Sequence, residues 1–480
     1  MLYKIGLVGL PNVGKSSLFN WLSSSDKAKV APFPFSTLQP LTTTIPLEDP
    51  VLDQIYDLIS WRFKDSLSRE KFLKKNACFE LVDIAGIVPL DGLPAHSNRE
   101  DKKSELGSSF LAHIRSVKMI LLVVRAFINE SVSSELKSFV EEHPEYYSAI
   151  SSWKRWEETS SQKVELRKTK EAFQEQGILD RTQLDSSFSR IEGVLEAEER
   201  RTSPMYRERI KDSETVMEAQ LVLLSLISSD LELLDKMISK YSKDQRTFEK
   251  ELKVLIPIRE ELKVRRFIPI SLLPSYSLLK ENERNIVDRL SLLSSKKIVI
   301  VGNYGSSDQS LEKLKELREW SLSHSFAFAS INLEGEEFCS LLTSEEEKKE
   351  TRESPYLRDS SEEKLLKTIL VTLGLKSFYT FRLEDEKRKK YSLSNLSWEA
   401  SPVKGELRSW FFHVNDSLQE CAARIHNDFA DYFVSARILE SSKFLGLDSS
   451  QNVSSVASSV SKSFQLKGGE IVQIVASAPH

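Results

Sequence analysis

Residues 9–16 read Gly-Leu-Pro-Asn-Val-Gly-Lys-Ser and match the pattern GxxxxGK[ST]. The apolar run 3–8 precedes the pattern and a helical pattern over 15–21 follows it, so we expect a strand, a loop and a helix. In such a loop, backbone N–H groups, the positive helix end and the lysine attract phosphate oxygens. The sequence therefore predicts a nucleotide phosphate site. Its expected residues are Asn12, Val13, Gly14, Lys15, Ser16 and Ser17.

A second element, Asp83-Ile-Ala-Gly86, follows the apolar segment 79–82. A carboxylate at the end of a buried strand can hold Mg²⁺ through water, and the N–H of Gly86 can reach a γ-phosphate. Thr37, in the segment 32–40, could act as a first switch, although this composition also suits an ordinary surface loop. The predicted magnesium ligands are Ser16, Thr37 and Asp83, and the predicted catalytic residues are Lys15, Thr37 and Gly86.

The residue after Gly86 is Ile87, where many GTPases carry a glutamine that orients water. An isoleucine side chain cannot bind water, so we expect hydrolysis to be slow or arranged by other groups. The sequence shows no obvious side chain near this position that could act as the general base for hydrolysis.

A candidate base-binding element, Asn303-Tyr304-Gly305-Ser306, follows the apolar run 297–301. Guanine-specific proteins carry NKxD at this point, and the carboxylate accepts hydrogen bonds from guanine. Ser306 supplies no negative charge, so strong guanine selectivity is not expected. The strand that ends near Ser330 would place backbone close to the base. The predicted base-side residues are Asn303, Tyr304 and Ser330.

Short apolar runs alternate with helical patterns and predict an α/β fold with a mostly parallel sheet. From 212 onward, apolar residues recur three or four apart and indicate an antiparallel helical hairpin. The packing of 129–211 is left open by its polar composition. We predict a P-loop NTPase domain at 1–128 and 297–376, interrupted by a helical insertion at 129–296.

The remainder, 377–480, changes character and predicts a small α+β domain. Its expected strands are 377–383, 407–414 and 470–477, with a helix over 418–429. A helix ending near Gly374 should precede this domain. The segment 345–363 is charge-dense and expected to be exposed, and 449–463 is serine-rich and expected to be mobile.

The overall composition excludes several classes of protein. The chain has 480 residues, is 40% hydrophobic and carries a net charge of −4, which excludes a disordered chain and a bulk polyanion binder. Its 3 cysteines lie far apart, which argues against a disulfide framework and fits a reducing cytoplasm. We expect no membrane or targeting segment. RNA contact through local basic groups such as Lys263 or 387–390 is a further hypothesis.

Several of these stretches together resemble the Obg-like ATPase family of the YchF type. They are GLPNVGKSSLFN, PFPFSTLQP, LVDIAGIV, LLVVRAF and ARIHNDFADYFVSARI with GGEIVQI. The resemblance implies a P-loop domain of the translation-factor class, a coiled-coil insertion and a C-terminal ubiquitin-like TGS domain. It also implies Mg²⁺, ATP preferred over GTP, a hydrophobic residue at position 87 and association with ribosomes.

The chain departs from the family pattern at identifiable positions. Ser306 replaces the usual glutamate, Leu122 stands where some relatives have a histidine, and 129–211 and 384–404 are expected insertions. Asn12 resembles an asparagine that coordinates K⁺ in some related GTPases, but an asparagine can equally stabilise the loop.

The leading hypothesis is a cytoplasmic, slowly ATP-hydrolysing molecular switch that associates with ribosomes. One alternative is a nucleotide-binding interaction protein with little hydrolysis. The other is a GTPase with relaxed base specificity.

Overall fold

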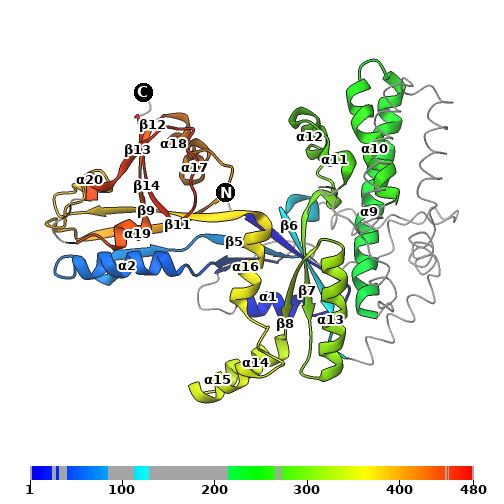
Figure 1. Cartoon of the computed structure of the whole chain (residues 1–480), viewed down its shortest axis with the longest axis horizontal. Helices are drawn as coiled ribbons and strands as arrows, with labels where there is room; N and C mark the ends of the chain where they lie inside the picture. Colours follow the sequence, from blue (N-terminus) through cyan, green and yellow to red (C-terminus); the bar gives the residue numbers. More distant parts are fainter. Residues whose placement is uncertain are drawn as a thin grey trace.

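The structure is a computed structural model that describes residues 3–23, 29–31, 41–84, 113–128, 214–264, 270, 273–448, 451 and 453–477. These residues form two β-sheets with flanking helices and a helical arm (Figure 1). The predicted insertion 129–211 lies outside the described residues. None of the helices in the described part of the chain is both long enough and apolar enough to cross a membrane.

The first sheet has the strand order β2-β3-β5-β1-β6-β7-β8. Its five parallel strands are β1 (Tyr3–Val8), β5 (Cys78–Asp83), β6 (Met119–Arg125), β7 (Lys297–Asn303) and β8 (Ala327–Ile331). The prediction of a mostly parallel α/β sheet is confirmed. All residues of β6 are buried, as expected for a central strand covered on both faces. Two strands that the sequence did not reveal extend the sheet by antiparallel pairing: β3 (Leu41–Pro46) beside β5, and β2 (Lys29–Ala31) at the edge.

Five described helices follow strands β1, β7 and β8 in the chain: α1 (Lys15–Ser23), α13 (Asp308–Ser323), α14 (Leu333–Leu341), α15 (Glu345–Glu353) and α16 (Glu362–Leu373). Helices α1, α13 and α16 pack on the sheet, whereas α15 projects away from it (Figure 1). Helix α16 begins where Ser361 accepts a hydrogen bond from the N–H of Lys364 and ends at Gly374, whose φ is +69°. The predicted helix end near Gly374 is therefore confirmed. Helix α15 has no buried residue, as expected for 345–363, but Leu357 and Ser360 of the same segment are buried, so the exposed segment ends before them.

A long helix, α9 (Glu214–Tyr241), and α10 (Glu249–Val264) pack side by side as a hairpin (Figure 1). The first half of α9 packs against the core of the first sheet through Val216, Ala219 and Leu223. Its second half shares a separate core with α10, α11 (Pro274–Ser277) and α12 (Glu281–Asp288). One continuous helix thus joins the sheet to the helical arm.

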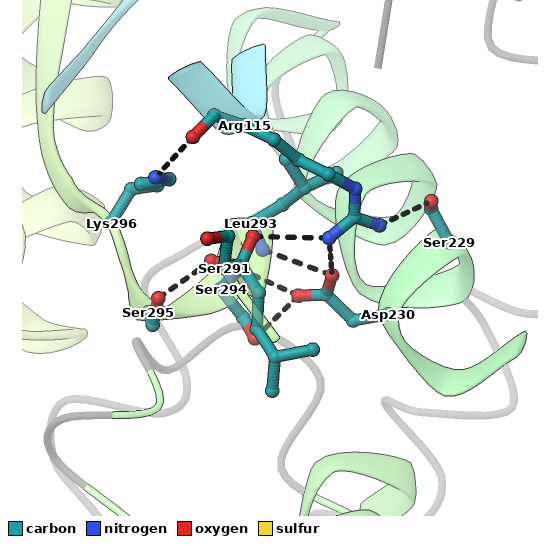
Figure 2. Close-up of polar contacts among 9 residues, drawn as sticks. Arg115, Ser229, Asp230, Ser291, Leu293, Ser294, Ser295 and Lys296 are labelled. Carbon is teal, nitrogen blue, oxygen red and sulfur yellow. Dashed lines mark hydrogen bonds and ion pairs between the residues drawn. The ribbon is translucent and has the colours of Figure 1, made fainter. Parts of the chain in front are cut away.

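A buried carboxylate attaches α9 to the start of β7 (Figure 2). Asp230 is fully buried and accepts hydrogen bonds from the N–H groups of Leu293 and Ser294, at 2.9 and 2.7 Å, and from the Ser294 hydroxyl. Arg115 lies 3.5 Å away. Because these donors compensate the buried carboxylate, the short 3₁₀ turn Leu293–Ser295 stays fixed to the middle of α9.

Lys296, beside this cluster, provides a test of its electrostatics (Figure 2). Its Nζ donates to the carbonyl oxygen of Arg115 at 2.7 Å. Burial, followed by the cations of Lys118 and Arg115, lowers the pKa of Lys296 to about 8, against the opposing effect of Asp230. Between this value and the ordinary lysine pKa, the unfolded chain binds more protons than the folded one, so rising pH favours folding. We expect wild type to gain unfolding free energy relative to Lys296→Met from pH 7 to 10 in denaturant titrations. A pH-independent difference would contradict this assignment.

The second sheet has the order β13-β12-β14-β9-β11-β4, and β10 pairs with β9. Its strands are β9 (Leu375–Glu384), β10 (Lys390–Tyr391), β11 (Lys404–His413), β12 (Phe433–Glu440), β13 (Ser458–Val460), β14 (Glu470–Ala476) and β4 (Phe72–Lys75). Strands are present at all three predicted places. The helix expected over 418–429 is instead two helices, α17 (Leu418–Ile425) and α18 (Asn427–Asp431), because His426 has an extended backbone.

The expected mobility of 449–463 is wrong for its described part. Helix α20 (Val453–Val456) and β13 lie here, and β13 pairs antiparallel with β12. Val453 is fully buried in the core of the second sheet. The serine-rich composition gave no sign of the few residues in this segment that pack in the core or pair in the sheet. In 384–404, Leu393 and Leu396 are likewise buried in this core.

The most unexpected feature is the position of residues 50–75. Helix α2 (Pro50–Arg62) packs into the core of the second sheet, and β4 pairs in parallel with β11. The hydroxyl of Tyr379 donates to the carboxylate of Asp49, which caps α2. Part of the range 1–128 therefore packs with residues of the range 377–480. The division into the three predicted domains stays a prediction.

Candidate functional site

The loop between β1 and α1 depends on two close backbone approaches. Gly14 has φ +99°, and a Cβ there would lie 2.4 Å from Nδ2 of Asn303. A Cβ on Gly9 would lie 2.4 Å from the carbonyl oxygen of Val123 in β6. Asn12 also adopts a left-handed conformation, with φ +60°. The glycines of the pattern thus let the loop pack directly against two neighbouring strands.

Three of the predicted phosphate and metal residues lie together at the start of α1. Lys15 is buried and its Nζ donates to the carbonyl oxygen of Leu10 at 2.6 Å. Burial lowers the pKa of Lys15, and the nearby carboxylate of Asp83 opposes this shift. Burial raises the pKa of Asp83, while Lys15 and the hydroxyl of Ser16 lower it. Ser16 donates to Asp83 at 3.4 Å. A hydroxyl beside a carboxylate fits the oxygen ligands that Mg²⁺ prefers.

A cavity of about 590 Å³ opens at this loop, a size typical of small-molecule sites. It brings together predicted residues from the loop and from the end of β7. The described residues that line it are Asn12, Gly14, Lys15, Ser16, Ser17, Phe127, Asn303, Tyr304, Leu333, Glu334 and Glu337. Val13 and Ser330 are not among them. Val13 is buried in the core, and the hydroxyl of Ser330 donates to the carbonyl oxygen of Asp359.

Asn303 connects the loop to two other strands. Its Nδ2 donates to the carbonyl oxygen of Val13 at 3.0 Å, and its own carbonyl oxygen accepts from the N–H groups of Ala126 and Phe127. The N–H of Tyr304 donates to the carbonyl oxygen of Ile331 at 2.9 Å. The side chain of Asn303 therefore ties the base-side segment to the phosphate loop, and backbone hydrogen bonds tie it to the ends of β6 and β8.

Four residues of the cavity were missed by the sequence analysis. They are Phe127, Leu333, Glu334 and Glu337. Phe127 and Leu333 come two residues after β6 and β8, at the carboxyl edge of the parallel sheet where ligands bind in this class of fold. That edge rule is the signal that could have found these two. The position of the two glutamates at the cavity depends on the direction in which α14 runs, and no local sequence pattern indicates that direction.

The other predicted positions divide into two groups. Thr37, Gly86 and Ile87 lie outside the described residues, so their roles stay predictions. Leu122 is fully buried in β6, and Ser306 accepts a hydrogen bond from Nδ2 of Asn332 at 3.1 Å.

This sheet and loop define the class of protein: a P-loop nucleoside triphosphatase with a GTPase fold. Family models agree with it. Residues 4–151 match the model described as "50S ribosome-binding GTPase". Residues 402–476 match YchF-GTPase_C, described as "Protein of unknown function (DUF933)". By these two matches the chain is similar to YchF-type GTPases in its N-terminal and C-terminal parts.

Full-length relatives extend this similarity over both sheets. The chain is 25% identical over 453 residues to "Ribosome-binding ATPase YchF" of Bacillus subtilis, covering 91% of this chain and 88% of the relative. The protein of that name from Buchnera aphidicola is 23% identical and covers 99% of both chains. The Escherichia coli O157:H7 protein is 38% identical over 132 residues, 28% of this chain and 31% of that one.

A solved structure agrees with this fold. It is titled "Structure of the Schizosaccharomyces pombe YchF GTPase" and is 18% identical to this chain. The match covers 98% of this chain and 97% of that one, with a TM-score of 0.59. At this identity the comparison concerns the fold alone.

Proposed function

We propose that this protein is a slowly ATP-hydrolysing molecular switch that associates with ribosomes. The observation that carries the proposal is that Lys15 and Ser16 line the same cavity as Asn303 and Tyr304. Phosphate-binding and base-binding groups at one cavity suit a nucleoside triphosphate. The preference for ATP is supported by Ser306, which offers no carboxylate at the guanine-reading position, and by the names of the relatives.

The proposed chemistry assigns different tasks to the residues of the cavity. Lys15 and the loop N–H groups bind the phosphates and stabilise charge as the γ-phosphoryl group is transferred to water. Ser16, Thr37 and Asp83 would hold Mg²⁺, which neutralises phosphate charge when bound. Gly86 would contact the γ-phosphate. We further propose that Asn12, at the cavity wall, contributes to a K⁺ site.

The proposed turnover is slow because Ile87 cannot orient water and Leu122 is an apolar, buried residue of β6. The same two residues favour the second candidate function, a nucleotide-binding interaction protein with little hydrolysis. Competition binding with ATP, GTP and their diphosphates tests the base preference. Single-turnover hydrolysis distinguishes the switch from the interaction protein. Equal binding of GTP and ATP would support relaxed base specificity.

The ribosome is the proposed partner because relatives of full length are named ribosome-binding ATPases. Such a partner would place the protein in the cytoplasm. Local basic groups such as Lys263 and 387–390 could supply RNA contacts within that complex.

We expect the fraction of protein that sediments with purified ribosomes to differ between ATP and ADP, because the nucleotide would change the switch loops. It should also fall as salt rises from about 50 to 200 mM, because phosphate contacts release counterions. Co-sedimentation measures both effects. Ribosome binding that is equal with ATP and ADP would contradict the switch function. Ribosome binding that does not change with salt would contradict the proposed RNA contacts.

A further inference from the structure

Helix α9 contacts the end of β6 through a buried carboxylate in its second turn. The N–H of Arg125, the last residue of β6, donates to Oε2 of Glu218 at 3.3 Å. The guanidinium of Arg125 donates to Oε1 of Glu218, through Nε at 3.0 Å and through Nη2 at 2.6 Å. Both side chains are buried. Glu218 therefore binds both the backbone and the side chain at the point where β6 ends.

Phe127 follows this strand end by two residues and lines the cavity. The N–H groups of Ala126 and Phe127 donate to the carbonyl oxygen of Asn303, at 2.7 and 3.1 Å. A Cβ on Gly305 would lie only 3.3 Å from Cβ of Phe127, so these two residues pack closely. Phe127 thus forms an aromatic wall of the cavity beside the predicted base-binding segment, and its position depends on where β6 ends.

The same helix also contacts the element that follows the neighbouring strand β7. Glu214, in the first turn of α9, lies 3.8 Å from Nζ of Lys313 in α13, the helix that comes after the base-binding segment. This second pair is partly exposed to solvent and contributes little by itself. The pair of Arg125 with Glu218 is shielded from solvent, so it is the contact through which α9 can hold the base side of the cavity.

We infer that Glu218 is a positioning residue of the proposed nucleotide site. Through Arg125 it fixes the end of β6, so that Phe127 packs against the base of a bound nucleotide. Groups that contact a ligand need a supporting layer of hydrogen bonds to hold their geometry, and stacking on an aromatic ring is a contact that every base can make. The inference rests on the proposed nucleotide site. It concerns the base alone, because the phosphate-binding residues are positioned by the loop between β1 and α1.

The test compares ATP with ribose 5-triphosphate, which has the sugar and the phosphates but no base. Both are titrated with Mg²⁺ into the full chain and into Glu218→Gln. The matched control is Asp235→Asn, which removes a carboxylate of the same helix that pairs with Arg259 in α10. We expect Glu218→Gln to bind ATP about tenfold more weakly than wild type, and the control to bind it as wild type does. The affinity for ribose 5-triphosphate should be unchanged in both variants.

A second variant separates positioning from stability. The double variant Arg125→Met, Glu218→Leu removes both charges and keeps apolar side chains at the buried site, so it should remain folded. It lacks the three hydrogen bonds to the strand end, and we expect the same selective loss of affinity for ATP. Thermal melting under the binding conditions checks that each variant is folded.

Three results would overturn the inference. Wild-type affinity for ATP in the folded double variant would mean that the pair only stabilises the fold. An equal loss of affinity for both ligands would mean that the whole cavity is disturbed. Equal binding of the two ligands by wild type would mean that the base makes no contact to be positioned. Absence of any nucleotide binding by wild type would contradict the proposed function instead.

Discussion

Replacing Lys15 by alanine is expected to lower the single-turnover rate of ATP hydrolysis by about a hundredfold to a thousandfold. The lysine is a buried cation at the cavity wall, beside Asp83. Charge stabilisation in such a water-poor site contributes far more than in water, and removal of one such group typically has an effect of this size. Quenched-flow measurement with excess protein over radiolabelled ATP isolates the chemical step from product release.

The matched control is Lys4→Ala, which removes a half-exposed lysine of the same strand-loop-helix unit, paired with Glu80. This variant should hydrolyse ATP at the wild-type rate. The apo form of Lys15→Ala should remain folded, because burial already disfavours the charged lysine in the empty cavity. Equal hydrolysis rates for wild type and Lys15→Ala would contradict the proposed ATPase function. They would favour the second candidate, a nucleotide-binding interaction protein with little hydrolysis.

Replacing Arg125 by methionine is expected to lower the free energy of unfolding by about 3–5 kcal/mol. Nη2 and Nε of Arg125 donate to Oε1 of Glu218 in α9, at 2.6 and 3.0 Å, and the two side chains are 2% and 3% exposed. The variant would leave the carboxylate of Glu218 buried without its cation. Denaturant unfolding at neutral pH measures the loss.

The loss should depend on pH in a defined direction. Burial raises the pKa of Glu218, and Arg125 opposes this shift. Without Arg125 the folded-state pKa rises further above the unfolded value, so the folded chain binds the extra proton as pH falls. The variant should therefore be less destabilised at pH 5 than at pH 8.

Two controls separate the buried pair from charge removal in general. Lys253→Met breaks an exposed pair with Glu249 in α10 and should cost about 0.5 kcal/mol or less. The double variant Arg125→Met, Glu218→Leu removes both charges and should recover much of the loss. A loss below about 1 kcal/mol in Arg125→Met would contradict a structural role for the pair.

This pair also connects the helical arm to the cavity. The N–H groups of Ala126 and Phe127, the two residues after Arg125, donate to the carbonyl oxygen of Asn303. Glu218 thus anchors α9 to the strand end that carries part of the cavity wall. The sequence indicated an apolar helical face from 212 onward but no partner for Glu218.

The amino-acid sequence by itself determined the local elements of this protein. The loop around Gly14 and Lys15, the continuous apolar strands and the 3.6-residue period of α9 are properties of neighbouring residues, so each could be predicted without knowing what it packs against. The absence of a carboxylate at position 306 is likewise visible in the sequence. Even the broken helix at His426 and the strand within the serine-rich segment changed only the details of these predictions.

Only the tertiary structure decided which distant residues meet. The pairing of β4 with β11, the ion pair of Arg125 with Glu218, and the position of Glu334 beside the phosphate loop join residues that are far apart in the chain. A side chain's own sequence neighbourhood carries no signal for such a partner, because the partner is selected by how whole strands and helices pack. For that reason the phosphate side of the cavity was predictable, while the carboxylates of α14 became visible only in the folded chain.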